Sequence, residues 1–104
     1  MGTILATSRT PDVLAELGRR LKTLRLQRNL RVRDLAADSG VSPRTISRLE
    51  AGRSVGTENL VRVLRGLGRL PALDAFLPPP EASPREIARL GGKVRQRASG
   101  PDDG

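Results

Sequence analysis

The stretch VRDLAADSGVSPRTISRLEAG, residues 32–52, decides the fold of this chain. Its pattern predicts two short helices joined by a tight turn. Gly40 is expected to end the first helix, because glycine tolerates the left-handed backbone that follows many helix C-termini. Ser42 can cap the second helix, and Pro43 suits its first turn because the N–H that proline lacks would be unpaired there. A helix, a turn and a second helix are therefore expected within this stretch.

The second of these helices is expected to have two chemically different faces. Ile46 and Leu49 are three residues apart, so they share one side of the helix and should point into a core. Arg44, Ser47 and Arg48 fall largely on the opposite side. A short helix with a buried aliphatic edge and an arginine-bearing outer edge suits the major groove of duplex DNA.

The bulk composition is compatible with a DNA-binding domain. A chain of 104 residues forms one domain with one tail, and its 19 Lys and Arg against 11 Asp and Glu give a net charge of +8. All but two of the cations are arginine, whose planar fork bonds two acceptors of a phosphate or a guanine at once. A solvated, arginine-rich surface would explain the charge alone equally well. Phe76 is the single aromatic residue, which favours duplex DNA over single strands held by stacking.

Cysteine and histidine are both missing, and their absence disfavours several function classes. Without cysteine the chain has no disulfide and no thiolate metal site, and without histidine it lacks the usual general base and the commonest metal ligand. We therefore expect no enzymatic activity, no metal and no cofactor. No apolar run approaches the ~20 residues of a membrane span, and no secretion signal is visible. A cytoplasmic protein without a membrane partner is expected.

An N-terminal helix is predicted from Thr10, a candidate cap, to about Asn29. Arg25 lies next to the apolar stripe of this helix, where a buried arginine needs a carboxylate. Glu50 is the expected partner in a structural ion pair, and the alternative is that Arg25 is simply exposed. The stripe itself has 3-4-3 spacing and favours core packing over a coiled-coil seam: Leu14, Leu17, Leu21 and Leu24.

Beyond residue 52, Thr57 is expected to cap a further helix, and a last short helix follows. The further helix has an apolar inner face: Leu60, Val63, Leu64 and Leu67. The last helix carries more apolar residues than a small core needs, so they are dimer-interface candidates: Leu70, Leu73, Phe76 and Leu77. The predicted organisation is a flexible N-terminal arm at 1–9, a domain at 10–77, and a Pro-rich spacer with a basic, largely disordered tail at 78–104.

With these elements placed, residues 17–70 resemble the helix-turn-helix domain of lambda-repressor-like, Cro/XRE-type regulators. The resemblance is carried by LGRRLKTLRLQRNL, RDLAADSGVSPRTISRLEAGR and TENLVRVLRGLG. It implies an all-α, five-helix DNA-binding domain in which residues 43–50 form the recognition helix. It also implies that Arg25 and Glu50 form the buried ion pair of this family.

Two departures from the family pattern shift the implied DNA contacts. Arg31 and Val32 stand where the family usually has Thr-Gln, so Arg31 or Arg33 is expected to take over a phosphate contact. Pro43 stands where a glutamine often reads a base. Base readout is then expected from four residues, with phosphate contact the alternative for the two arginines: Arg44, Thr45, Ser47 and Arg48. Phosphate contacts are expected from five residues: Arg31, Arg33, Ser42, Arg53 and Asn59.

Two compatible functions follow from the resemblance. The first is a homodimeric repressor that places two recognition helices, about 34 Å apart, in successive major grooves of an inverted-repeat operator. The second rests on the whole chain, including the tail SPREIARLGGKVRQR, which is similar to small regulators encoded beside HipA-type kinase toxins. It implies a HipB-like antitoxin that represses its own operon and captures the toxin through the tail.

Overall fold

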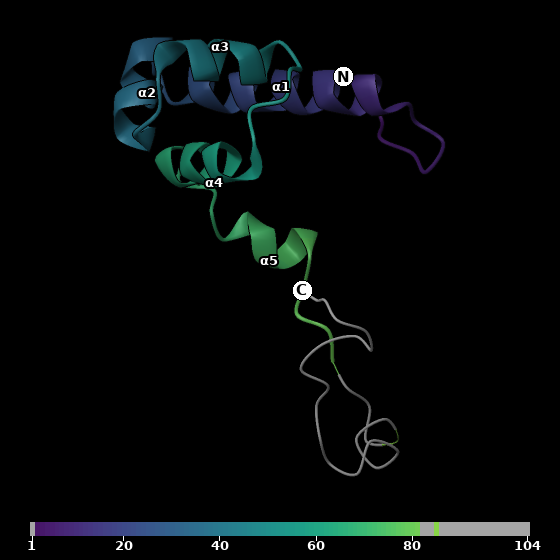
Figure 1. Ribbon diagram of the computed structural model, residues 1–104. Helices are drawn as coiled ribbons and strands as arrows, with labels where there is room; N and C mark the ends of the chain where they lie inside the picture. Colours follow the sequence, from purple (N-terminus) through teal and green to yellow (C-terminus); the bar gives the residue numbers. More distant parts are fainter. Residues whose placement is uncertain (1, 82–84, 86–104) are drawn as a thin grey trace, which may run out of the picture.

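The computed structural model describes residues 2–81 and residue 85, and this part of the chain is helical without strands (Figure 1). Five helices follow one another along it: α1 (Thr10–Gln27), α2 (Val32–Ser39), α3 (Pro43–Glu50), α4 (Thr57–Gly66) and α5 (Ala72–Phe76). The expected all-α, five-helix architecture with a helix-turn-helix is confirmed. Apart from Arg85, the predicted disordered tail lies outside the described residues from residue 82 onward.

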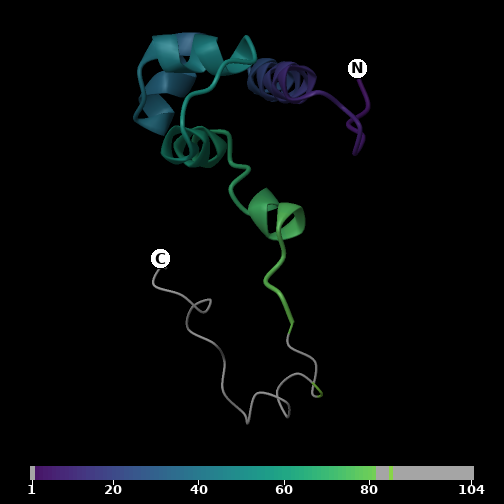
Figure 2. The ribbon, with the colours of Figure 1, turned by 45° about the vertical axis from the view of Figure 1, so that its right-hand side comes forward.

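The helices α1 to α4 surround one core. α2 packs against α3 and α4, and α3 also packs against α1, while α5 follows α4 at the edge of this group (Figure 1, Figure 2). Six of the buried core residues come from α1 to α4, and the seventh, Leu67, directly follows α4. They are Leu21, Leu35, Ala36, Ile46, Leu49, Val63 and Leu67. Leu17 and Leu24 pack at the edge of this core, so, together with Leu21, three of the four leucines of the predicted stripe take part in core packing.

The turn between α2 and α3 has the local conformations that its residues favour. Gly40 follows α2 with a left-handed φ of 71°, and its position is the C-cap of the helix. The Ser42 hydroxyl accepts a hydrogen bond from the Thr45 backbone N–H at 3.1 Å, which caps α3. This turn holds α2 and α3 as a helix-turn-helix pair.

Two predicted caps are wrong, because both helices begin one residue earlier than expected. Thr10 and Thr57 are the first residues of α1 and α4, while Arg9 and Gly56 occupy the N-cap positions without a side-chain capping bond. The carbonyl of Arg9 accepts the first backbone bonds of α1 from Asp12 and Val13. Gly56, with a φ of 86°, adopts the backbone turn that leads into α4.

Gly18 lies on α1 directly against the backbone at the end of α3. A Cβ atom at this position would lie 2.6 Å from the carbonyl oxygens of both Leu49 and Glu50. Such a distance is far below van der Waals contact, and backbone atoms cannot rotate out of the way. A glycine inside α1 is therefore required for α1 to lie backbone to backbone against the end of α3.

Gly18→Ala is expected to destabilise the domain by roughly 1–3 kcal/mol, because the added methyl group forces α1 away from α3. Alanine favours a helix over glycine by about 1 kcal/mol, so the measured loss is what remains after that gain. Urea unfolding followed by circular dichroism measures it. The exposed Lys22→Ala in the same helix is the control and should stay within ~0.5 kcal/mol of the parent. A Gly18→Ala domain as stable as the parent would contradict the close approach.

The N-terminal segment at residues 2–9 folds back along α1 (Figure 1, purple). The Gly2 backbone N–H donates to Glu16 Oε1 at 2.9 Å, and Arg20 Nη2 donates to the Gly2 carbonyl at 3.1 Å. Glu16 is only 2% exposed and pairs with both Arg19 and Arg20. Hydrogen bonds from Arg19, from the Gly2 backbone and from Arg20 lower the pKa of Glu16 to about 2. The carboxylate therefore stays ionised and ties Gly2 to α1.

Candidate nucleic-acid interface

The helix α3 divides into a buried side and an open side. Ile46 and Leu49 are 1% and 5% exposed and point into the core. Arg44 and Ser47 are exposed on the other side, and Arg48 is half-buried one turn after Arg44. Among the described residues, neither arginine side chain has a hydrogen-bond or ion-pair partner. The outer edge of α3 therefore offers two unneutralised guanidinium groups on a rigid helix.

Arg25 and Glu50 come together and fix the end of α3. Arg25 is 6% exposed, and its Nε and Nη2 donate to the two Glu50 carboxylate oxygens at 2.7 and 3.0 Å. Its Nη1 donates to the Leu30 carbonyl at 2.8 Å. The hydrogen bonds to Glu50 raise the pKa of Arg25 above its ordinary value. One buried guanidinium thus joins α1, the loop before α2 and the last residue of α3.

The remaining base-readout candidate, Thr45, is half-buried at the start of α3. Its hydroxyl lies 2.9 Å from the Ser42 hydroxyl, so these two side chains bond to each other. Ser42 also caps the helix, as described above, and its hydroxyl is therefore engaged twice. Any contact of Ser42 or Thr45 with DNA would share a hydroxyl that already stabilises the start of α3.

The other phosphate candidates divide into engaged and open side chains. Arg31 is paired with Asp34, with 3.1 Å between its Nε and the carboxylate, and hydrogen bonds from Arg31 lower the pKa of Asp34. The Asn59 side-chain amide donates to the Val55 carbonyl at 2.8 Å and so holds the loop before α4. Arg33 and Arg53 are exposed, and within the described ranges their side chains have no hydrogen-bond partner. Among the five phosphate candidates, Arg33 and Arg53 are therefore the arginines whose charge remains open.

Two structural residues were not singled out by the sequence patterns. The Arg28 Nη1 donates to the Gly66 carbonyl at 3.2 Å and so connects the end of α1 to the end of α4. Glu16 is the buried anchor of the N-terminal segment. Its sequence signal is the i+3 and i+4 spacing to Arg19 and Arg20, which is typical of ion pairs along a helix.

The dimer-interface candidates lie within α5 and on either side of it. Phe76 and Leu77 are 78% and 75% exposed, while Leu70 and Leu73 are half-buried. An open groove of about 530 Å³ runs along Leu70, Pro71, Leu73 and Asp74. No residue of α5 is buried. This end of the domain therefore presents an apolar surface that the described part of the chain does not cover.

Comparison with known proteins places this arrangement of helices in a family. A family model described as a helix-turn-helix domain matches residues 16–77, which is more than half of the chain. The comparisons with curated proteins and with solved structures found no match to the chain. Across residues 2–81 and 85, no helix is both long enough and apolar enough to pass through a membrane.

Proposed function

The chain belongs to the helix-turn-helix domain family, and we propose that it is a sequence-specific transcriptional repressor acting on duplex DNA. The observation that carries this proposal is the division of α3 into a buried aliphatic side and an open arginine side. An α-helix fits the major groove, where each base pair presents its own donors and acceptors. The net charge of +8 adds attraction to phosphates that does not depend on sequence.

Within this proposal, Arg44 and Arg48 read bases. Each guanidinium can donate two hydrogen bonds to O6 and N7 of a guanine. Arg33 and Arg53 contact phosphates, since their side chains are exposed and unneutralised. Arg31 is a weaker candidate for a phosphate contact, because Asp34 already neutralises its charge. Arg25 and Glu50 contact no DNA and hold α3 at its angle to α1.

The proposed repressor is a homodimer. The exposed Phe76 and Leu77 favour this, because water-exposed apolar side chains gathered at one end of a small domain are stabilised by burial against a second copy. A twofold dimer binds two half-sites one helical turn apart, which is why an inverted-repeat operator is part of the proposal.

The HipB-like antitoxin alternative depends on residues 81–104, nearly all of which lie outside the described residues. It adds capture of a HipA-type kinase toxin to the same DNA-binding domain. Deleting residues 81–104 should then abolish binding to the toxin and leave DNA binding nearly intact.

Selection from random duplexes tests the proposed repressor. The full chain should enrich an inverted repeat and bind it with two chains per duplex. The logarithm of its affinity should fall with the logarithm of salt concentration, with a slope of about −0.9 per phosphate neutralised. Equal affinity for every duplex, with no enriched sequence, would contradict the proposal. Fluorescence anisotropy over a salt series measures both the slope and the preference.

A further inference from the structure

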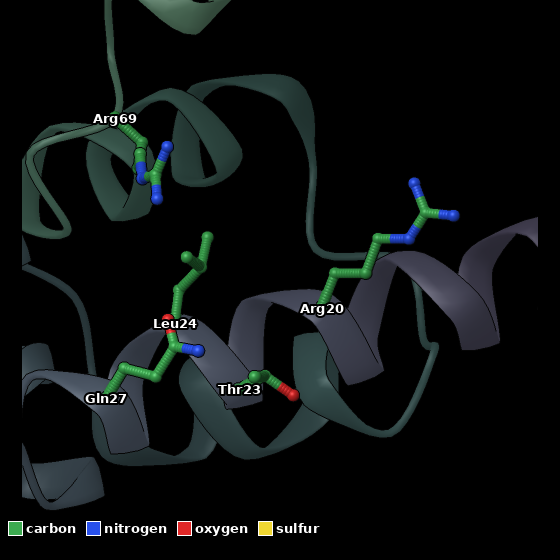
Figure 3. A pocket seen from close by; sticks show the side chains of 5 residues that line it. All are labelled: Arg20, Thr23, Leu24, Gln27 and Arg69. Carbon is green, nitrogen blue, oxygen red and sulfur yellow. The ribbon is translucent and has the colours of Figure 1, made fainter. Parts of the chain in front are cut away.

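A second cationic surface lies between α1 and the segment that joins α4 to α5. It is an open groove of about 450 Å³ (Figure 3). Leu24 rises from α1 and Arg69 reaches down toward it from the opposite wall, while Arg20 rises from α1 on the same side as Leu24. The groove therefore has an apolar floor between two guanidinium groups. Five residues line it: Arg20, Thr23, Leu24, Gln27 and Arg69.

This groove opens on the side of α1 that faces away from α3. Gly18 meets the α3 backbone and Arg25 binds Glu50, and these two residues are seven apart on one side of α1. Arg20 and Gln27 of the groove each come two residues after Gly18 and Arg25, respectively. Two residues correspond to a rotation of roughly 200° around the helix axis, so the groove residues lie on the opposite side of α1. A molecule bound in the groove therefore does not contact the outer edge of α3.

The polar groups of the groove are available for an anion. Among the described residues, the guanidinium of Arg69 and the amide of Gln27 form no hydrogen bond. Arg20 donates from Nε to Glu16 and from Nη2 to the Gly2 carbonyl, and its Nη1 makes no hydrogen bond to another described residue. The nearby carboxylate of Glu16 is buried and already accepts hydrogen bonds from two arginines and the Gly2 backbone. The charge of Arg20 is therefore paired with Glu16, and the open positive charge of the groove is that of Arg69.

We propose that this groove binds an acidic segment of a partner protein. An aliphatic side chain of the acidic segment covers Leu24. Carboxylates on the neighbouring residues of that segment accept hydrogen bonds from Arg69, from Gln27 and from Nη1 of Arg20. Charge complementarity selects this occupant, and charge-assisted hydrogen bonds give it direction. A nucleic-acid backbone offers phosphates without an apolar group to cover Leu24, so an acidic protein segment fits better. The site goes beyond the DNA-binding role and leaves α3 free.

A peptide titration on the full chain tests the proposal. The probe is a ten-residue peptide with one leucine between Glu and Asp residues. Three comparison probes are a peptide with Gln and Asn in place of the acids, a peptide with Ser in place of the leucine, and a duplex oligonucleotide. In NMR spectra of the chain, the acidic peptide should shift the signals of Thr23, Leu24 and Gln27 in a saturable way. Arg69→Gln should weaken binding about tenfold or more, because a hydrogen bond to a charged group is lost.

Arg65→Gln is the matched control, since it removes the same charge from an exposed arginine of α4 that does not line the groove. It should leave the affinity for the peptide unchanged. The proposal is overturned by equal losses in the two variants, by equal affinity for the peptide without leucine, or by no saturable binding. Shifts centred on α3, displacement of the peptide by operator DNA, or the same groove shifts with the oligonucleotide would also overturn it. These outcomes leave the DNA-binding proposal standing, because α3 is assayed separately.

Discussion

Arg25→Ala is expected to destabilise the domain by about 3–5 kcal/mol. The substitution leaves the Glu50 carboxylate, whose side chain is 10% exposed, without its guanidinium partner. It also removes the donor to the Leu30 carbonyl, so the loop before α2 loses a hydrogen bond. A charge left in a nearly dry site costs far more than the intact pair contributes, because water no longer solvates it.

Denaturant unfolding of Arg25→Ala measures this loss directly. Arg33→Ala is the matched control, since it removes an exposed arginine without a described ion-pair partner and should change stability by less than ~0.5 kcal/mol. The double variant Arg25→Met with Glu50→Leu should recover most of the loss, because it removes both charges and fills a similar volume. An Arg25→Ala domain that unfolds like the parent would show that the pair does not hold α1 to α3.

Arg44→Ala with Arg48→Ala is expected to abolish the preference for an operator over an unrelated duplex. Each guanidinium that bonds a guanine is worth about 1–3 kcal/mol of discrimination at its own base pair. The fold should survive, because neither side chain forms a hydrogen bond to another described residue and Arg44 is exposed. Binding to the selected operator and to a shuffled duplex, at several salt concentrations, measures both preference and affinity.

The same experiment separates base readout from phosphate contact. If an arginine contacts a phosphate, its removal weakens binding to every duplex alike and reduces the salt slope by about 1. Arg65→Ala with Arg69→Ala is the control, because it removes two positive charges that lie outside α3. If the control variant loses the operator preference as completely as the α3 variant, the side chains of α3 do not determine which DNA sequence is bound.

Several features of the fold could be predicted from the sequence, because they depend on the spacing and backbone preferences of neighbouring residues. The spacing of Ile46 and Leu49 determines which side of α3 is buried, since residues three apart share a face. Gly40 marks the turn through its backbone freedom. The pairing of Arg25 with Glu50 was expected because a buried guanidinium requires a carboxylate, and because the family resemblance implies this pair. The same local rules misplaced the helix starts at Thr10 and Thr57 by one residue.

Other features were decided only when α1 to α4 came together. Gly18 looks like a weakness inside a helix, and only the approach of the α3 backbone shows why a side chain is excluded there. The Arg28 guanidinium, just after α1, reaches the Gly66 carbonyl at the end of α4, a contact that no local spacing predicts. The partners of Arg31 and Asn59, in contrast, are local: Asp34 and the Val55 carbonyl lie three and four residues away along the chain. The groove at Leu24 and Arg69 joins residues far apart in sequence, so no periodicity predicts it. The sequence determined the elements and their inner faces, because these follow from neighbouring residues. The tertiary structure decided which residues far apart in the sequence meet, such as Gly18 with the end of α3 and Arg28 with Gly66, because these contacts are set by distance in space.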